Sequence, residues 1–188
     1  MITENSMISN WQKNKKVIDS KEKRPANKMY LIAAAFILAA ICSGLCLRFV
    51  RVNGPSMEPT LQHNDWVISL PQAYRNEMPE RGDVILLWRP SLTQGYIVKR
   101  VVGLPGEQVE IRNGMVFVNN ERIDDPFMVE DLQDSMEPLL VEPGCYFVLG
   151  DNRASSKDSR DWEDPFVHHE ELRGKVWYMI YPQLRKIA

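Results

Sequence analysis

Two polar residues, Ser56 and Lys99, lie in sequence settings that could make them reactive. Ser56 belongs to Asn53–Leu61, which reads Asn-Gly-Pro-Ser-Met-Glu-Pro-Thr-Leu. Gly54 permits close backbone approach, and the two prolines restrict the chain around the serine, so the segment is predicted to be a stiff, exposed turn. Ser56 is therefore a candidate nucleophile. An ordinary tight turn with an incidental serine is the alternative, because Gly, Pro and Ser are common turn residues.

A serine hydroxyl needs a base to take its proton, and Lys99 is the best candidate. It lies in Tyr96–Val102, an apolar stretch predicted to be a strand. Side chains alternate along a strand, so Lys99 shares a face with Ile97 and Val101, and Arg100 takes the other face. Burial can lower the pKa of a lysine by several units, whereas an arginine keeps its proton. Taken alone, a strand lysine is usually a surface residue.

Histidine is the more usual base, but the three histidines are poorly placed. His168 and His169 are adjacent in an acidic loop, and His63 follows Ser56 by seven residues, too near to fold back easily from an extended turn. Each is predicted to be a solvated loop residue. No helical His-Glu-x-x-His motif or spaced His/carboxylate cluster supports a metal-dependent hydrolase.

A third polar cluster, Gly150–Arg160, follows a predicted strand and is dense in short donors and acceptors. Asp158 and Arg160 could pair and help to hold a lysine ammonium group. A solvated loop stabilised by Asx turns is the alternative.

The elements that would position these residues begin with residues 29–47, which contain no charged side chain and predict a transmembrane anchor. Residues 1–28 carry seven Lys/Arg against three Asp/Glu and are predicted to form a disordered cytoplasmic tail, which places residues 48–188 outside the cytoplasm. A cleavable signal is the alternative, but no Ala-x-Ala triplet follows the stretch. The whole chain has a net charge of −2, and because the tail is basic, the main domain must be acidic. An acidic domain argues against nucleic-acid binding.

The main domain is predicted to be mainly β, an antiparallel, barrel-like fold of about eight to ten strands. Asn113-Gly114 predicts a hairpin. Residues 124–143 are predicted to be a reduced surface excursion, and 151–171 a long polar loop. The clearest strands are expected at 65–70, 83–88, 95–102, 108–112, 115–118, 144–150 and 174–181.

Together these stretches resemble the bacterial type I signal peptidases of the Gram-positive kind, which are membrane-anchored Ser-Lys serine peptidases. The resemblance covers Arg48–Arg160 and rests on several short motifs in the family's order. The motifs are Ser56-Met57-x-Pro59-Thr60-Leu61, Gly82-Asp83-Val84-Ile85, Lys99-Arg100-Val101-Val102-Gly103-Leu104-Pro105-Gly106-Glu107, and Gly150-Asp151-Asn152-Arg153 with Ser156, Asp158, Ser159 and Arg160.

The resemblance implies that Ser56 is the nucleophile and Lys99 the general base. It also implies that Ser156 orients the lysine and that Asp158 and Arg160 form a supporting pair. The implied activity is removal of N-terminal signal peptides from exported pre-proteins at the cell membrane, with no metal or organic cofactor. The implied partners are pre-protein signal peptides and membrane lipid, with the secretion translocon as a further candidate.

The resemblance leaves the second oxyanion donor open. Better-known Gram-negative members carry a serine hydroxyl two residues before the nucleophile, where this chain has Gly54. Pocket-lining residues for the small side chains before the cut are implied at Val52, Met57, Leu61, Ile97 and Val98.

Three other readings of the chain remain. A self-cleaving Ser-Lys protease would share the chemistry but have a soluble or DNA-binding N-terminal arm. A signal-peptidase-like, non-catalytic assembly factor would keep the fold, although the presence of both Ser56 and Lys99 counts against it. A membrane-tethered β-domain without an active site would leave Lys99 unexplained.

Overall fold

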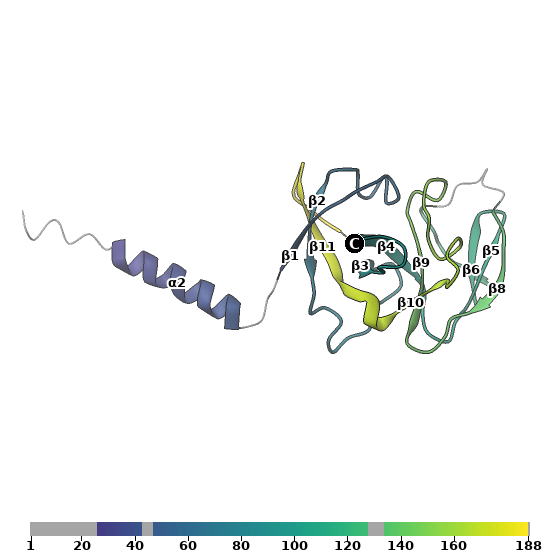
Figure 1. Ribbon diagram of the computed structural model, residues 1–188, viewed down its shortest axis with the longest axis horizontal. Helices are drawn as coiled ribbons and strands as arrows, with labels where there is room; N and C mark the ends of the chain where they lie inside the picture. Colours follow the sequence, from purple (N-terminus) through teal and green to yellow (C-terminus); the bar gives the residue numbers. More distant parts are fainter. Residues whose placement is uncertain (1–25, 43–46, 128–133, 188) are drawn as a thin grey trace, which may run out of the picture. The chain divides into compact units, whose positions relative to one another are not determined.

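The structure is a computed structural model that describes residues 26–42, 47–127 and 134–187 (Figure 1). The chain divides into two compact units, Met1–Leu45 and Cys46–Ala188. The predicted tail at 1–28 lies almost entirely outside the described residues. The candidate site lies in the second unit.

In the first unit, the described residues form one helix, α2 (Ala26–Cys42). The helix is rich in Ala, Leu and Ile, and its large apolar side chains are exposed. No helix among the described residues combines the length and hydropathy needed to cross a membrane. The predicted anchor at 29–47 is thus helical as far as Cys42, and residues 43–46 lie outside the described residues.

The second unit is built on a large antiparallel sheet of eight strands. Its order is β1 (Arg48–Arg51), β2 (Trp66–Leu70), β11 (Leu172–Tyr181), β3 (Val84–Trp88), β4 (Tyr96–Gly103), β9 (Cys145–Leu149) and β10 (Phe166–His168), and β12 (Arg185–Lys186) pairs with β11. The sheet curls, as Figure 1 shows, and register shifts in β11 and β4 mark irregular positions in its pairing. Within the described residues β1 and β10 are its two edges, so the expected barrel is an open, curled half-barrel.

A smaller antiparallel sheet has the order β7 (Glu121–Arg122), β6 (Met115–Val118), β5 (Gln108–Arg112) and β8 (Met136–Leu140). β5 and β6 form the hairpin predicted from Asn113-Gly114, and both turn residues have positive φ angles. Apolar residues of β5 and β6 pack against β9 and β10 in one buried cluster. The small sheet therefore lies against the β9–β10 end of the large sheet.

Two predicted loops contain strands that the sequence did not indicate. β8 lies inside the excursion expected at 124–143, where Pro138 obscured it, and it pairs with β5. β10 lies inside the loop expected at 151–171, followed by the short 3-10 helix η1 (His169–Glu171). Both strands are short and pair at the edge of a sheet, so their sequences carry little periodic signal.

β3 is the buried centre of the large sheet and carries apolar side chains on both faces. Val84 and Leu86 join one cluster. That cluster also contains Val52, Met57 and Leu61, which flank Ser56 in the sequence. Ile85 and Leu87 join a second cluster on the other face. The part of β4 that carries Lys99, from Tyr96 to Arg100, pairs with the whole of β3. β4 is therefore a rigid support for Lys99.

Candidate active site

Ser56 lies in a loop that the core and its own backbone hold closed. The Val52 N–H donates to the Asp65 carbonyl oxygen at 2.8 Å, and the Leu61 N–H donates to the Met57 carbonyl oxygen at 2.8 Å. Met57 and Leu61 are buried in the apolar cluster below the loop. Ser56 remains half-buried and lines a groove.

Lys99 is buried in β4, opposite Ile85 of β3, and only 2% of it is exposed. Its strand neighbours Ile97 and Val101 pack in the same apolar cluster as Ile85, as the alternation along β4 predicts. Burial disfavours the ammonium form and lowers the pKa of Lys99 to about 8, against the opposing pull of Asp158. In a fraction of the protein molecules, Lys99 is therefore a neutral amine near neutral pH.

The loop after β9 supplies the polar partners of this lysine. The Lys99 Nζ donates to the Ser156 Oγ at 2.8 Å, and the Ser156 Oγ donates to Asp158 Oδ2 at 2.6 Å. Asp158 is fully buried and also accepts from the Gly150 N–H and from Arg160 Nε. Burial alone would raise the pKa of Asp158, but hydrogen bonds and charge from Arg160 hold it below its ordinary value. Asp158 is therefore a fixed carboxylate.

Gly150 lets this loop pack directly on the Ser56 loop. A Cβ at Gly150 would collide with the Ser156 Oγ and with the Ser56 carbonyl oxygen, so these two atoms flank the same small space. The Asn152 N–H donates to the Ser56 carbonyl oxygen at 3.1 Å. The loop thus brings the backbone of Ser56 near Ser156, whose Oγ accepts the hydrogen bond from Lys99.

The structure does not join Ser56 directly to Lys99. No hydrogen bond links the Ser56 hydroxyl to the lysine among the described residues, and the Nζ is held by Ser156 instead. Hydrogen bonds between catalytic groups are often long in enzymes without substrate and tighten when substrate binds. The link that the structure shows is indirect: the Lys99 Nζ contacts the Ser156 Oγ, and that Oγ and the Ser56 carbonyl oxygen flank the same space beside Gly150.

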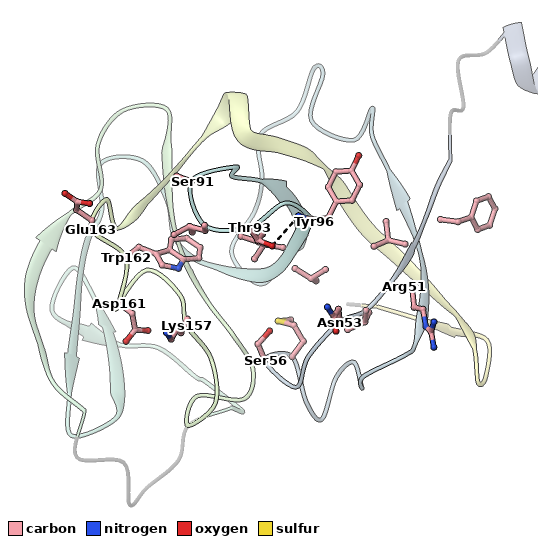
Figure 2. Close-up of a pocket in the computed structure, with 18 residues that line it drawn as sticks. Arg51, Asn53, Ser56, Ser91, Thr93, Tyr96, Lys157, Asp161, Trp162 and Glu163 are labelled. Atoms are coloured by element: carbon pink, nitrogen blue, oxygen red, sulfur yellow. Dashed lines mark hydrogen bonds between the residues drawn. The ribbon is translucent and has the colours of Figure 1, made fainter.

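A groove of about 980 Å³ opens at Ser56. In Figure 2, Arg51 and Asn53 lie to one side of Ser56, and Lys157, Asp161 and Trp162 lie to the other. The lining residues are Phe49 to Asn53, Ser56, Met57, Ser91 to Thr93, Gly95 to Val98, Lys157 and Asp161 to Glu163.

The groove includes most but not all of the residues expected in the substrate pocket. Val52, Met57, Ile97 and Val98 line it. Leu61 is fully buried in the core and is not among the lining residues. The wall from Asp161 to Glu163 was not predicted, although Trp162 is a large side chain in an otherwise polar loop and could have signalled it.

His63 is an exposed loop residue, as expected, but the expectation that it could not fold back toward Ser56 was wrong. Its Nδ1 accepts a hydrogen bond from the Gly54 N–H at 3.1 Å. The segment between them is not extended, because the Leu61 to Met57 hydrogen bond makes a helical turn and the pairing of Val52 with Asp65 closes the loop. The two limbs therefore come together.

The hydrogen bond between Ser156 and Lys99 leads to a first prediction. In Ser156→Ala the Nζ loses its acceptor and the amine is no longer held in place, so kcat of a reaction that uses Lys99 as base should fall by roughly ten- to a hundredfold. Steady-state kinetics would measure this. Ser155→Ala is the matched control, because Ser155 is exposed in the same loop and should leave kcat unchanged. Equal kcat values for the two variants would contradict the role of Ser156.

Comparison with known proteins places the chain in a family. The family model "Signal peptidase, peptidase S26" matches residues 26–181. Signal peptidase I S of Bacillus subtilis is 30% identical over 89% of this chain and 96% of its own length. Signal peptidase IB of Staphylococcus aureus is 32% identical over 80% of this chain and 86% of its own.

A crystal structure of a signal peptidase I from Enterococcus faecalis aligns with 53% of this chain and 97% of that chain, at 29% identity and a TM-score of 0.46. The match of the family model and the curated relatives show that the chain belongs to the signal peptidase family, peptidase S26. It is a serine endopeptidase of the signal peptidase I type.

Proposed function

We propose that this peptidase removes N-terminal signal peptides from exported pre-proteins, with Ser56 as nucleophile and Lys99 as general base. The observation that carries the proposal is the setting of Lys99: a buried amine with a pKa lowered to about 8, held by Ser156 at 2.8 Å. The Ser156 Oγ and the Ser56 carbonyl oxygen in turn flank the same small space beside Gly150. A neutral lysine beside a serine can activate the hydroxyl without a histidine.

In the proposed reaction, Lys99 Nζ takes the Ser56 Oγ proton as the Oγ attacks the carbonyl carbon before the cut. The resulting ammonium gives that proton to the departing amine, which leaves an acyl-enzyme ester on Ser56. Lys99 then takes a proton from water as the hydroxide attacks the ester carbon. The bond from that carbon to the Ser56 Oγ breaks, the signal peptide leaves with a new carboxyl end, and the Lys99 ammonium returns its proton to the Ser56 Oγ. Ser156 and Asp158 hold Nζ in position through both steps.

The Ser56 N–H is the proposed donor to the oxyanion. It has no hydrogen-bond partner among the described residues, so it is free to bind a developing negative charge. The Gly54 N–H is already engaged with His63 at 3.1 Å. Gly54 therefore supplies neither a hydroxyl nor a free N–H in this conformation.

The substrate is proposed to bind as an extended strand in the groove, with small residues at the first and third positions before the cut. Two exposed strand edges line the groove and support this. β1 pairs only with β2, and β4 pairs with β9 only from Arg100 onward, so the edge at 96–98 is unpaired within the described residues. A peptide can add its backbone hydrogen bonds to such edges.

A membrane anchor at residues 29–47, with residues 1–28 cytoplasmic and 48–188 extracytoplasmic, completes the proposal. It is supported by the run of uncharged residues, by the lysine excess before it, and by the exposed apolar side chains along α2. Membrane lipid and the secretion translocon are the proposed partners. Extraction of membranes at alkaline pH tests the anchor, because an anchored chain stays in the pellet.

The proposed function is tested by incubating the full chain in detergent with a pre-protein and locating the cut by mass spectrometry. Because only the neutral amine accepts a proton, kcat/KM should rise about tenfold per pH unit below pH 8 and level off above the Lys99 pKa of about 8. A cut elsewhere than at the end of the signal peptide would contradict the substrate assignment. A profile that is flat from pH 6 to 9 would contradict the lysine base.

A further inference from the structure

The two limbs of the Ser56 loop are held in different ways. The limb after Ser56 is fixed by packing, because Met57 and Leu61 are buried in the core. The base of the loop is closed by backbone hydrogen bonds, from the Val52 N–H to the Asp65 carbonyl oxygen at 2.8 Å and from the Asn64 N–H to the Val52 carbonyl oxygen at 2.9 Å. These contacts leave the limb before Ser56 to be held by something else.

In the limb before Ser56, the backbone of Gly54 is tied by one side chain. The Gly54 N–H donates to the exposed His63 Nδ1 at 3.1 Å. In the described part of the chain, one other hydrogen bond joins residues 53–55 to the limb after Ser56, from the Glu58 N–H to the Pro55 carbonyl oxygen at 3.0 Å, and it does not involve Gly54. Gly54 has a φ of +97°, and nothing lies within 4 Å of where its Cβ would be. Asn53 and Pro55 are exposed. Packing therefore does not fix the glycine, and the hydrogen bond to His63 is the contact that holds its N–H.

We propose that His63 is a positioning residue for the nucleophile, which rests on the proposed role of Ser56. A glycine explores more backbone conformations than any other residue, so an untethered Gly54 would let Ser56 sample orientations that do not face Lys99. The His63 Nδ1 must carry no proton to accept from Gly54, so the imidazole acts here as a fixed acceptor and not as a base. The hydrogen bond also turns the Gly54 N–H toward His63, which leaves the oxyanion to the Ser56 N–H.

Two substitutions of His63 distinguish the effect of its hydrogen-bond acceptor from the effect of the rest of the imidazole ring. His63→Ala removes the acceptor, and kcat for pre-protein cleavage should fall about tenfold while KM changes by less than about twofold. His63→Asn places an amide oxygen at the position of Nδ1, so it should keep about half or more of the wild-type kcat. His168→Asn is the matched control, because His168 is an exposed histidine that is not among the residues lining the groove and whose ring contacts Asp164 and Cys145. It should leave kcat unchanged.

Amide hydrogen exchange gives a readout that does not depend on activity. In the full chain in detergent micelles, the Gly54 amide should exchange about tenfold faster or more in His63→Ala than in the wild type, and remain protected in His63→Asn. If the wild type cleaved no pre-protein, the proposed function would fail, and Gly54 exchange would still decide whether His63 holds the turn.

Three results would overturn the positioning role. One is an unchanged kcat in His63→Ala, and another is an equal loss of kcat in His63→Ala and His63→Asn. The third is unchanged Gly54 exchange in His63→Ala. A lower thermal unfolding midpoint that accounts for the loss of activity in His63→Ala would assign His63 a general structural role instead, so the midpoint is measured for every variant.

Discussion

Ser56→Ala is expected to lower cleavage of a pre-protein by at least about a thousandfold, because the acyl-enzyme cannot form without the Oγ. The protein should stay folded. Ser56 is half-buried at the groove, and its hydroxyl makes no hydrogen bond among the described residues, so its removal leaves no buried polar group unpaired. Single-turnover cleavage in detergent, followed by gel and mass spectrometry, measures the loss.

The control for Ser56→Ala is Ser155→Ala, which removes an exposed hydroxyl outside the groove and should cleave at the wild-type rate. The Ser56→Ala protein should still bind the signal peptide, because the groove walls are unchanged. If Ser56→Ala kept more than a few per cent of the activity, another nucleophile would have to act, and the proposed dyad would be wrong.

Lys99→Met should cause a loss of similar size, at least about a thousandfold in kcat/KM, because it removes the proposed base for the Ser56 proton. Methionine keeps the length and the apolar character of the lysine stem, so the variant tests the amine alone. Its residual activity should also lose the rise with pH toward about 8 that the burial of the Lys99 amine confers. Initial rates from pH 6 to 9.5 measure both effects.

The stability of Lys99→Met should not fall with its activity. The pKa of the folded lysine is lowered from 10.5 to about 8, so the unfolded chain binds more protons in that range, and the lysine costs stability increasingly as the pH falls below 10.5. Methionine removes this cost. Lys186→Met, at an exposed position of β12, is the matched control and should keep wild-type activity. A Lys99→Met protein that is folded and retains a tenth of the wild-type rate would refute the lysine as base.

The alternation of side chains in a strand is what made Lys99 recognisable from sequence. Two adjacent cations in an apolar strand cannot both face water when the strand is covered on both faces, and only lysine can give up its proton. The structure buries Lys99 and leaves Arg100 half-buried with a carboxylate partner, Asp151, at 2.7 Å. Local patterns of this kind predicted the main strands and the hairpin at Asn113-Gly114.

Contacts between distant segments followed from no local pattern. Asp158 is buried because Arg160, Ser156 and the Gly150 N–H converge on it, and Arg160 is held in turn by Asp134, which lies in a segment predicted to be a surface excursion. The short strands β8 and β10 likewise exist because of their pairing with β5 and β9. β8 contains a proline and β10 has only three residues, so neither sequence specifies a strand by itself.

The sequence by itself determined which groups are present. They are a serine in a turn restricted by prolines, a lysine in an apolar strand, and a polar loop at 150–160. Only the tertiary structure decided how they meet. It showed that Ser156 holds the lysine, that the strand edges of β1 and β4 line the groove, and that His63 reaches Gly54. The physical reason is that residue type and alternation are local properties, whereas burial, pKa and hydrogen-bond partners depend on which segments pack together.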